Sequence, residues 1–381
     1  MQAYLDHAAA TPMRPESLAA MLPYLTEHFG NPSGSHAVAR RARSAVDDAR
    51  DEVAQCLGCG PGEVVFTSGG TEADNLAVLG VGASGRGTSM CSAVEHHAVG
   101  NTCAALGATV VPVDRSGVVD LDALAGALGP GVGLVSVMLV NNEVGSVQPL
   151  AEVDALVREL APRALLHTDA VAAVGWLDVA ALGAVADLVS VSAHKFGGPK
   201  GVGALVVRDR ARLAPVLHGG AQERGRRPGT QDVAGIVGMA AALRVATAER
   251  DEAVARVGRL RDRLADGLTA SIDGVGETAV RVGAGGVHDR SAKVANSCHL
   301  RIAGVDQEEL LVLLDDEGVC ASAGAACASG ALEASHVLMA MGFAADDAKS
   351  AVRLSLGYTT DDGEIDHVLE VVPKVVERLR T

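Results

Sequence analysis

The feature that most constrains the fold is a regular alternation of short apolar runs with helical stretches rich in Ala and Leu. Around and between the apolar runs, residues 37–57, 71–80 and 152–160 repeat apolar side chains with helical spacing. Such alternation is typical of a mostly parallel sheet covered by helices. We therefore predict an α/β fold, with strands at residues 64–67, 90–94, 109–113, 134–140, 164–167, 188–192 and 203–207.

The pattern changes towards the C-terminus. A long helical region begins after Val233 and is highly charged between residues 248 and 268, which suggests a bridge to a second domain. From about residue 272 the chain reads as α+β. Strands are expected at 294–300 and 350–356, and helices at 307–317 and 335–341. A length of 381 residues fits two domains.

Charge and cysteine content exclude several classes of protein. The formal net charge of −15 argues against a general nucleic-acid binder or a protein of anionic membranes. No leader and no apolar run of about 18 residues is present, so we expect a soluble, cytoplasmic protein. An odd count of seven cysteines is more typical of reduced thiols than of a disulfide framework. The single CxxC pair, Cys56 and Cys59, is interpreted as structural, and no metal site is predicted.

Five polar segments each follow a predicted strand directly. In open α/β sheets the ligand crevice lies at the carboxyl ends of the strands. Convergence of several segments on one edge is stronger evidence for a site than any single motif. The segments are residues 68–72, 95–97, 141–143, 168–170 and 192–195.

Three of these segments contain residues suited to a phosphorylated, planar cofactor. Gly70 and Thr71 open a helix, where free backbone N–H groups bind phosphate. Asp169 emerges from a buried strand and could keep a cofactor ring nitrogen protonated, as in pyridoxal phosphate (PLP) enzymes. His96 could stack on the ring and move protons. Taken alone, each has an ordinary structural alternative: a turn, a helix cap or ion pair, and a core histidine.

Lysine usage points to one further residue. Only five of the 32 basic residues are lysines, and the first is Lys195, which ends an apolar run. Arginine cannot form an imine because its guanidinium stays protonated, whereas lysine can when its pKa is lowered. We therefore predict that Lys195 forms a Schiff base, against the alternative of a surface lysine. The competitor Lys200 follows a Gly-Gly-Pro turn and better suits a phosphate-neighbouring or structural role.

A thiol stands in a run of very small residues. Cys327 lies within residues 321–330, almost all of which are Ala, Gly or Ser. Few side chains in this run are large enough to anchor the backbone by packing. We therefore expect the Cys327 thiol to lie on a loop rather than in a packed core. A nucleophilic role would need a nearby positive charge or helix N-terminus. A structural thiol is the alternative.

Together these motifs resemble the cysteine desulfurases of the NifS/IscS type, a fold-type I PLP family. The resemblance extends over nearly the whole chain. The matching segments are residues 4–9 (YLDHAA), 30–33 (GNPS), 67–72 (TSGGTE), 95–97 (EHH), 141–145 (NNEVG), 167–170 (HTDA), 192–195 (SAHK), 222–230 (QERGRRPGT), 335–338 (SHVL) and 353–357 (RLSLG).

The resemblance implies an architecture. It implies a mostly parallel seven-stranded sheet in a large PLP-binding domain at residues 13–255. A smaller α+β domain at residues 1–12 and 256–381 would carry the loop with the catalytic cysteine. The chain would form a homodimer.

The resemblance also implies residue roles. Lys195 would hold PLP covalently, Asp169 would pair with its ring nitrogen, and His96 would stack on the ring and act as acid and base. The remaining cofactor contacts would come from Gly70, Thr71, Ser192, His194, from Asn142 near the phenolic oxygen, and from Thr230 of the partner subunit. Asn31 and Arg353 would bind the substrate carboxylate.

The implied reaction converts L-cysteine to L-alanine. Cys327 would accept the sulfur as a persulfide and pass it to an acceptor protein. The pathway stays open between iron–sulfur cluster assembly, tRNA thiolation and DNA phosphorothioation, although the chain as a whole looks similar to an actinobacterial desulfurase of DNA phosphorothioation. The alternatives are a selenocysteine lyase or aminotransferase of the same fold, and a non-catalytic sulfur-carrier scaffold.

Two positions depart from the family pattern. Ala172 stands where many relatives carry Gln, so a cofactor hydrogen bond is missing there. Pro228 replaces a usual Ser. These departures concern the rate and the cofactor's electronics rather than the class of reaction.

Overall fold

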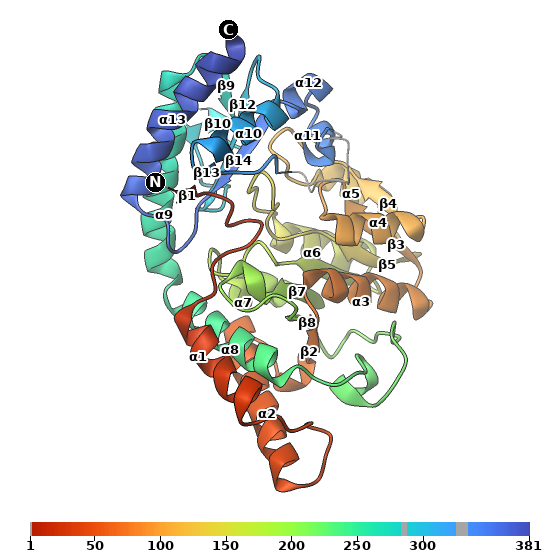
Figure 1. Ribbon diagram of the computed structural model, residues 1–381. Helices are drawn as coiled ribbons and strands as arrows, with labels where there is room; N and C mark the ends of the chain where they lie inside the picture. The colour runs from red at the N-terminus through yellow and green to blue at the C-terminus, as the bar shows by residue number, and fades with distance from the viewer. Residues whose placement is uncertain (1, 283–287, 325–333) are drawn as a thin grey trace.

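The computed structural model describes residues 2–282, 288–324 and 334–381. Its centre is a seven-stranded sheet in the order β2-β8-β7-β6-β5-β3-β4 (Figure 1). β8 is antiparallel to β2 and β7, and the remaining pairs are parallel. The predicted mostly parallel α/β sheet is therefore confirmed. Its strands are β2 (Val64–Thr67), β3 (Thr88–Ser92), β4 (Thr109–Val111), β5 (Val132–Ser136), β6 (Leu165–Asp169), β7 (Leu188–Ser192) and β8 (Gly203–Val207).

Alternate strand residues bury against two different helical layers. Leu165 and Leu188 pack with α3 (Gly70–Ala83) and α4 (His97–Ala105) on one face. Their neighbours Leu166 and Val189 belong to the core on the other face, under α2 (Ala37–Leu57), α5 (Leu121–Ala127), α6 (Leu150–Leu160) and α8 (Val233–Ala248). A sheet buried on both sides explains why its strands read as continuous apolar runs.

The structure differs from the predicted elements at several boundaries. The run 134–140 contains β5, which ends at Ser136. Beyond it Val137 N and Leu139 N still donate to carbonyls of β6, while Met138 N donates to the Glu95 carboxylate at 2.7 Å. The helices that were not predicted include α1 (Pro15–Thr26), which contains an internal proline, and α13 (Asp362–Arg380). A capping box at Asp361 and Glu364 was a signal for α13.

The C-terminal part surrounds a second sheet of three antiparallel strands, β9 (Val275–Glu277), β12 (Ser297–Ile302) and β14 (Ala351–Ser355). The long helix α9 (Arg250–Ser271) lies beside α13 (Figure 1). Shorter elements are α7 (Val179–Leu182), β10 (Arg281–Val282), β11 (His288–Asp289), α10 (Gln307–Asp316), α11 (His336–Ala340) and α12 (Ala345–Ala348). In the ranges described, no helix is both long and apolar enough to cross a membrane.

The N-terminal strand joins this second part. β1 (Ala3–Tyr4) pairs in parallel with β13 (Val319–Cys320). Ala3 and Leu5 are buried in a core cluster with residues of α9, α10 and α13 that is separate from the cores of the large sheet. On this basis we propose the division into a large domain at 13–255 and a small domain at 1–12 and 256–381.

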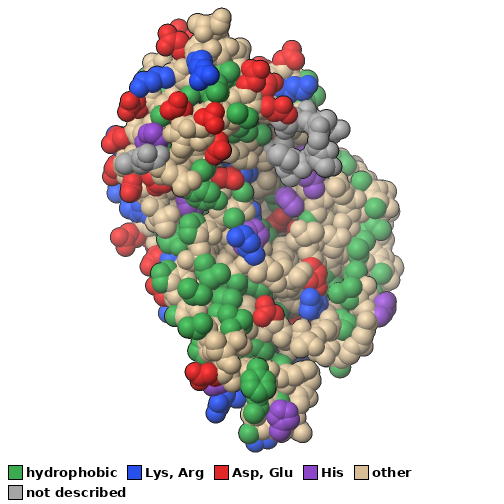
Figure 2. All heavy atoms as spheres, viewed as in Figure 1, with side chains coloured by type: hydrophobic (Ala, Val, Ile, Leu, Met, Phe, Trp, Pro, Cys, Tyr) green, Lys and Arg blue, Asp and Glu red, His purple; other side chains and the backbone are tan. Residues whose placement is uncertain are grey.

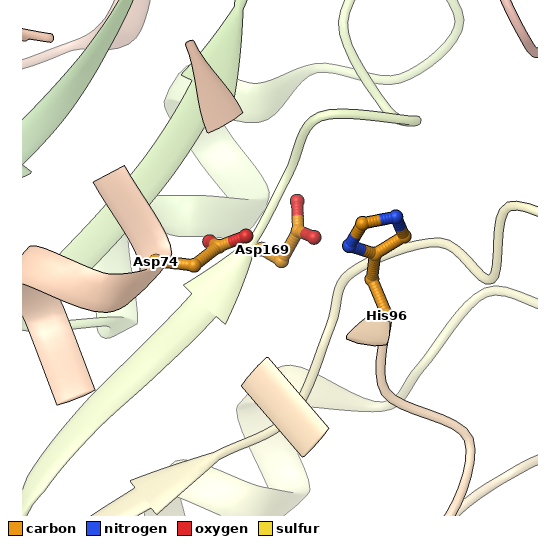
Figure 3. Close-up of side chains that lie close together, drawn as sticks. All are labelled: Asp74, His96 and Asp169. Atoms are coloured by element: carbon orange, nitrogen blue, oxygen red, sulfur yellow. The ribbon is translucent and has the colours of Figure 1, made fainter. Parts of the chain in front are cut away.

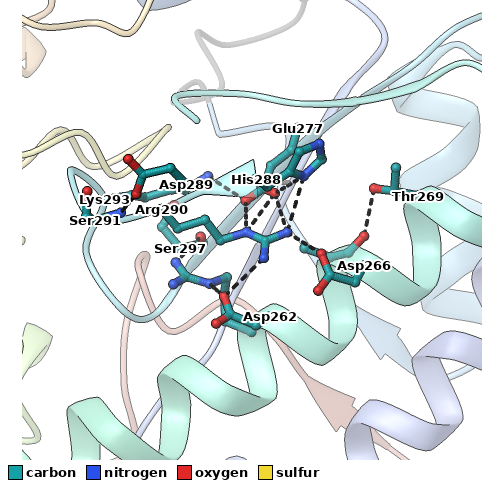
Figure 4. Close-up of polar contacts among 12 residues, drawn as sticks. Asp262, Asp266, Thr269, Glu277, His288, Asp289, Arg290, Ser291, Lys293 and Ser297 are labelled. Atoms are coloured by element: carbon teal, nitrogen blue, oxygen red, sulfur yellow. Dashed lines mark hydrogen bonds and ion pairs between the residues drawn. The ribbon is translucent and has the colours of Figure 1, made fainter. Parts of the chain in front are cut away.

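A cluster of buried charges connects α9 to the small-domain sheet (Figure 4). The Glu277 side chain is fully buried and pairs with Arg290 at 2.7 Å and with Lys293 at 3.4 Å. Burial alone would raise the pKa of Glu277, but hydrogen bonding from Arg290 holds that pKa below its usual value. Val294, next to Lys293, donates its N–H to the Gly145 carbonyl at 2.9 Å. The cluster therefore braces the turn at residues 141–145.

Candidate active site

A cavity of about 350 Å³ lies at the carboxyl ends of the central strands, a size typical of small-molecule sites. Figure 2 shows the molecule hollowed near the middle of this face, with histidine side chains gathered around the hollow. Nine of the predicted site residues line the cavity: Gly70, Thr71, His96, Asn142, Asp169, Ser192, His194, Lys195 and Arg353.

Lys195 follows β7 and reaches the cavity from the sheet. Its Nζ donates to the Ala8 carbonyl and to the Ala9 carbonyl, the latter at 3.0 Å. Burial, helped by the Arg353 charge, lowers the pKa of Lys195 to about 8. A lysine with a lowered pKa is neutral more often at neutral pH, so it is a better nucleophile and base. Lys200 is exposed and does not line the cavity.

Asp169 ends β6 and faces the same cavity. Its Oδ1 accepts a hydrogen bond from Val171 N at 2.8 Å. Burial raises the pKa of Asp169 to about 6, while the charge of Lys195 opposes this shift. A buried carboxylate with so few partners can hold a protonated ring nitrogen strongly, because little water competes for it.

Two further buried carboxyl groups lie near Asp169, and neither was predicted from the sequence. Asp74 lies on α3, and Glu95 follows β3. Burial raises the pKa of each well above the usual value, and the charge of Asp169 adds to the shift. Burial therefore favours the protonated, neutral form of Asp74 and Glu95. The position of Asp74 one helical turn after Gly70 was the only signal in the sequence.

His96 caps α4 and lies next to Asp169 at the cavity (Figure 3). Its Nδ1 accepts a hydrogen bond from Ala98 N at 3.1 Å. Burial, together with the charge of Lys195, lowers the pKa of His96 to about 4, so the ring is neutral. A neutral imidazole in this place can lie against a planar ring or accept a proton.

Asp74, His96 and Asp169 each place one potential ligand atom within 4.8 Å of the others, as a metal site would (Figure 3). The rest of the cavity favours a different occupant. A metal site needs neither a lysine with a lowered pKa nor a helix N-terminus suited to phosphate. A planar, phosphorylated aldehyde could bind to the lysine, the carboxylate, the imidazole and the helix N-terminus together.

The N-terminus of α3 forms the phosphate end of the cavity. Gly69 has φ +149°, a region that favours glycine, and the helix starts at Gly70 with its first N–H groups free. A Cβ on Gly70 would lie 2.8 Å from the Val171 side chain, so a larger residue would narrow the site. Ser192 Oγ and His194 Nδ1 are 2.9 Å apart beside it. Backbone N–H groups, hydroxyls and an imidazole together suit a phosphate group.

Arg353 lies on β14 and brings the small domain to the cavity. The residue is only 4 % exposed, and its guanidinium donates to the Asn142 carbonyl at 3.0 Å. It also pairs with the Asp6 carboxylate at 2.8 Å. A guanidinium held at the edge of a cavity is the usual partner of a substrate carboxylate.

Cys327 lies outside the described residues. The residues on both sides of segment 325–333 border the cavity: Ser322 and Gly324 before it, and His336 after it. Ser335 Oγ donates to the buried Glu143 carboxylate at 2.6 Å. The described residues that flank the segment therefore lie at or next to the cavity wall.

Two predicted residues do not lie at this cavity. Thr230 is exposed, and so is Asn31, whose Oδ1 accepts a hydrogen bond from Ser33 N at 3.0 Å in the connection between α1 and α2. Neither lines the cavity of its own chain. Ala172, the departure from the family pattern, does line it.

The cavity fits PLP on the chemistry of its donors. It offers an amine for the aldehyde, a carboxylate for the ring nitrogen, an imidazole beside the ring and a helix N-terminus for the phosphate. Across the sheet these groups follow β7, β6, β3 and β2 respectively, and the sheet places β2 on the β7 side and β3 on the β6 side.

Comparisons with known proteins agree with this chemistry. Residues 3–368 match the family model described as aminotransferase class-V. The chain is 41 % identical to the cysteine desulfurase IscS of Methanosarcina thermophila, over 99 % of this chain and 92 % of that protein. It is 43 % identical to the IscS-like cysteine desulfurase of Mycobacterium tuberculosis, over 99 % and 97 %.

Solved structures give the same result. A NifS-like protein superposes with a TM-score of 0.90 at 33 % identity, covering 99 % of this chain and 100 % of that one. DndA from Streptomyces lividans superposes with a TM-score of 0.73 at 34 % identity, covering 91 % and 97 %.

Proposed function

The chain belongs to the aminotransferase class-V family and is a PLP-dependent cysteine desulfurase, and we propose which of its residues carry the reaction and where its sulfur goes. Its fold is that of the fold-type I PLP enzymes. The observation that carries the residue assignment is the cavity, which brings Lys195, Asp169 and Arg353 together from three different strands or strand ends.

Each residue then has a defined task. Lys195 would hold the cofactor aldehyde and would take the proton from the substrate's α-carbon. PLP, when bound, supplies the electron sink that makes this proton removable. Asp169 would hold the ring-nitrogen proton, and His96 would serve beside the ring as a neutral acid–base group. Arg353 binds the substrate carboxylate and so fixes which bond points at Lys195.

Cys327 completes the reaction as the sulfur acceptor. Its thiolate attacks the substrate sulfur, so an S–S bond forms while the substrate Cβ–S bond breaks, and the bonding electrons stay on the carbon side. Protonation of that carbon yields L-alanine and leaves a persulfide on Cys327. Attachment of the flanking residues at the cavity supports this role, because Ser322, Gly324 and His336 all line it.

We propose that the enzyme is a homodimer with a shared site. Figure 2 shows hydrophobic side chains gathered over the region of α1 and α2. Among them Leu25 is 61 % exposed and Phe29 is 81 % exposed, which is unusual for large apolar side chains unless another surface covers them. Thr230 and Asn31 are exposed and away from their own cavity, so we assign both to the site of the partner subunit.

The shared site predicts that two defective subunits restore activity when they are combined. Thr230→Ala alone should weaken PLP binding about 10-fold or more, because a hydrogen bond to a charged group is lost. In a mixed dimer of Lys195→Ala and Thr230→Ala subunits, one site keeps both residues only if Thr230 acts across the interface. Separately tagged subunits, purified as mixed dimers, should then show about half of the wild-type kcat.

A mixed dimer without restored activity would contradict the shared site. If Thr230 serves its own chain, no intact site forms and the mixed dimer keeps only the activity of the Thr230→Ala site. Mixed dimers of Lys195→Ala with wild-type subunits are the control, because they hold one intact site under either arrangement.

We propose that the sulfur passes from Cys327 to an acceptor protein of iron–sulfur cluster assembly, since the relatives that match over nearly their full length are named IscS. Holoenzyme given L-cysteine with radiolabelled sulfur should release L-alanine and retain label on Cys327. Label should then appear on the scaffold protein of cluster assembly from the same organism. Transfer to a component of DNA phosphorothioation or tRNA thiolation instead would contradict this pathway.

The proposed location is the cytoplasm. The six cysteines of the described residues are all free thiols. Free thiols persist in a reducing compartment, where a persulfide carrier also keeps its reactivity.

A further inference from the structure

Arg353 has one carboxylate partner among the described residues, and that partner is Asp6. Arg353 Nη2 donates to Asp6 Oδ1 at 2.8 Å. Its Nη1 donates to the Asn142 carbonyl at 3.0 Å and lies 3.5 Å from the Gly324 carbonyl. Three of the five guanidinium N–H groups are thus directed at the protein, and Nε has no partner among the described residues. The guanidinium plane is held from two sides before any substrate arrives.

Asp6 is itself fixed by the backbone around it. It forms a parallel bridge with Ser355, two residues after Arg353 on β14. Ser355 N donates to the Leu5 carbonyl at 2.7 Å, and His7 N donates to the Ser355 carbonyl at 3.2 Å. The Tyr4 hydroxyl donates to the Asp6 carbonyl at 3.2 Å. A carboxylate anchored in this way keeps its place when a ligand binds.

Asp6 also lies outside the cavity that Arg353 borders. Its carboxylate therefore contacts the guanidinium from outside the set of residues that line the cavity. Arg and carboxylate groups form planar, directional pairs, so such a partner sets the direction in which the remaining N–H groups of the guanidinium point. The same segment continues to Ala8 and Ala9, whose carbonyls accept from Lys195.

We propose that Asp6 is a positioning residue for substrate recognition, which orients the Arg353 guanidinium so that it selects amino acids by their α-carboxylate. This inference rests on the proposed role of Arg353. We expect Asp6 to stay paired with Arg353 when the substrate binds, because the backbone on both sides of Asp6 is hydrogen-bonded to β14.

The test compares two ligands that differ only in the carboxylate. L-Alanine and ethylamine each bring an amine to the holoenzyme, and only L-alanine brings a carboxylate. Binding of each is followed by the change in the cofactor's absorbance. Asp6→Asn keeps a hydrogen-bond acceptor but removes the charge, so L-alanine should bind about 10-fold more weakly while ethylamine binds as before. Asp6→Ala should weaken L-alanine binding further.

Steady-state kinetics give a second readout. For L-cysteine, Asp6→Asn should raise KM by a factor similar to the loss of L-alanine affinity, with kcat changed by less than about threefold. Tyr358→Phe is the matched control: it removes a hydroxyl that holds the N-terminal segment at the Pro12 carbonyl and makes no bond to Asp6 or Arg353. It should leave both ligand affinities unchanged.

The outcomes distinguish the proposed role of Asp6 from the proposed role of Arg353. If Arg353→Gln weakens L-alanine but not ethylamine, and Asp6→Asn changes neither or tightens L-alanine, the role of Asp6 is wrong and that of Arg353 stands. If Arg353→Gln leaves the preference for L-alanine unchanged, the carboxylate anchor lies elsewhere and both assignments fail.

Discussion

Lys195→Ala should abolish turnover of L-cysteine, with kcat falling at least about 10⁴-fold, because one side chain both holds the cofactor and moves the α-proton. PLP should still bind through the N-terminus of α3 and Asp169, but without a covalent bond. Borohydride reduction followed by mass spectrometry measures this directly. The wild-type peptide that contains Lys195 should gain the mass of the reduced cofactor, and the variant should gain none.

Lys200→Ala is the matched control for this experiment. Lys200 is exposed and close in sequence, so its loss should leave the covalent bond and the activity in place. Lys293 cannot substitute for Lys195, because its ammonium is buried against Glu277 and the Thr278 carbonyl. A cofactor found on Lys200, or a protein that takes up no PLP at all, would overturn the site; the second result would favour a non-catalytic sulfur carrier.

Cys327→Ala should stop the reaction at a later stage. Release of L-alanine from L-cysteine should fall at least about 10³-fold, the scale expected when a nucleophile is deleted. Cofactor loading and the absorbance change on adding L-cysteine should stay as in the wild type, because Lys195, Asp169 and Arg353 are intact. Mass spectrometry of the protein after one turnover should show a persulfide on the wild type and none on the variant.

Cys320→Ala controls for the loss of a thiol in the same part of the small domain. Cys320 lies on β13, seven positions before Cys327, and pairs with the N-terminal strand. Its loss should leave alanine release unchanged. Full activity of Cys327→Ala would instead point to a selenocysteine lyase, and formation of a keto acid would point to an aminotransferase, since neither needs an acceptor thiol.

The central sheet and the cavity could be predicted because both follow from local sequence patterns. Strands buried on both faces are continuously apolar, so β6 and β7 stood out. Asp169 and Lys195 then appeared at the ends of those strands, where the topology places ligand-binding groups. In each case the residue and its signal lie within a few positions of one another.

The features that were missed depend on contacts distant in sequence. Asp6 and Arg353 are separated by 347 positions, and nothing near either residue indicates that they pair. Asp74 was not predicted, because only the fold shows that it is buried near Asp169. Thr230 and Asn31 came from the family resemblance alone, and a single chain does not bring either to the cavity.

The pairing of β1 with β13 has a consequence for how the enzyme is made. Ala3 and Tyr4 leave the ribosome long before their strand partners, Val319 and Cys320. This segment must therefore wait, unpaired, until more than 300 further residues have been synthesised. Since it supplies the carbonyls facing Lys195 and the carboxylate paired with Arg353, the large sheet can form early, while the catalytic centre is completed only after β13 and β14 have been made.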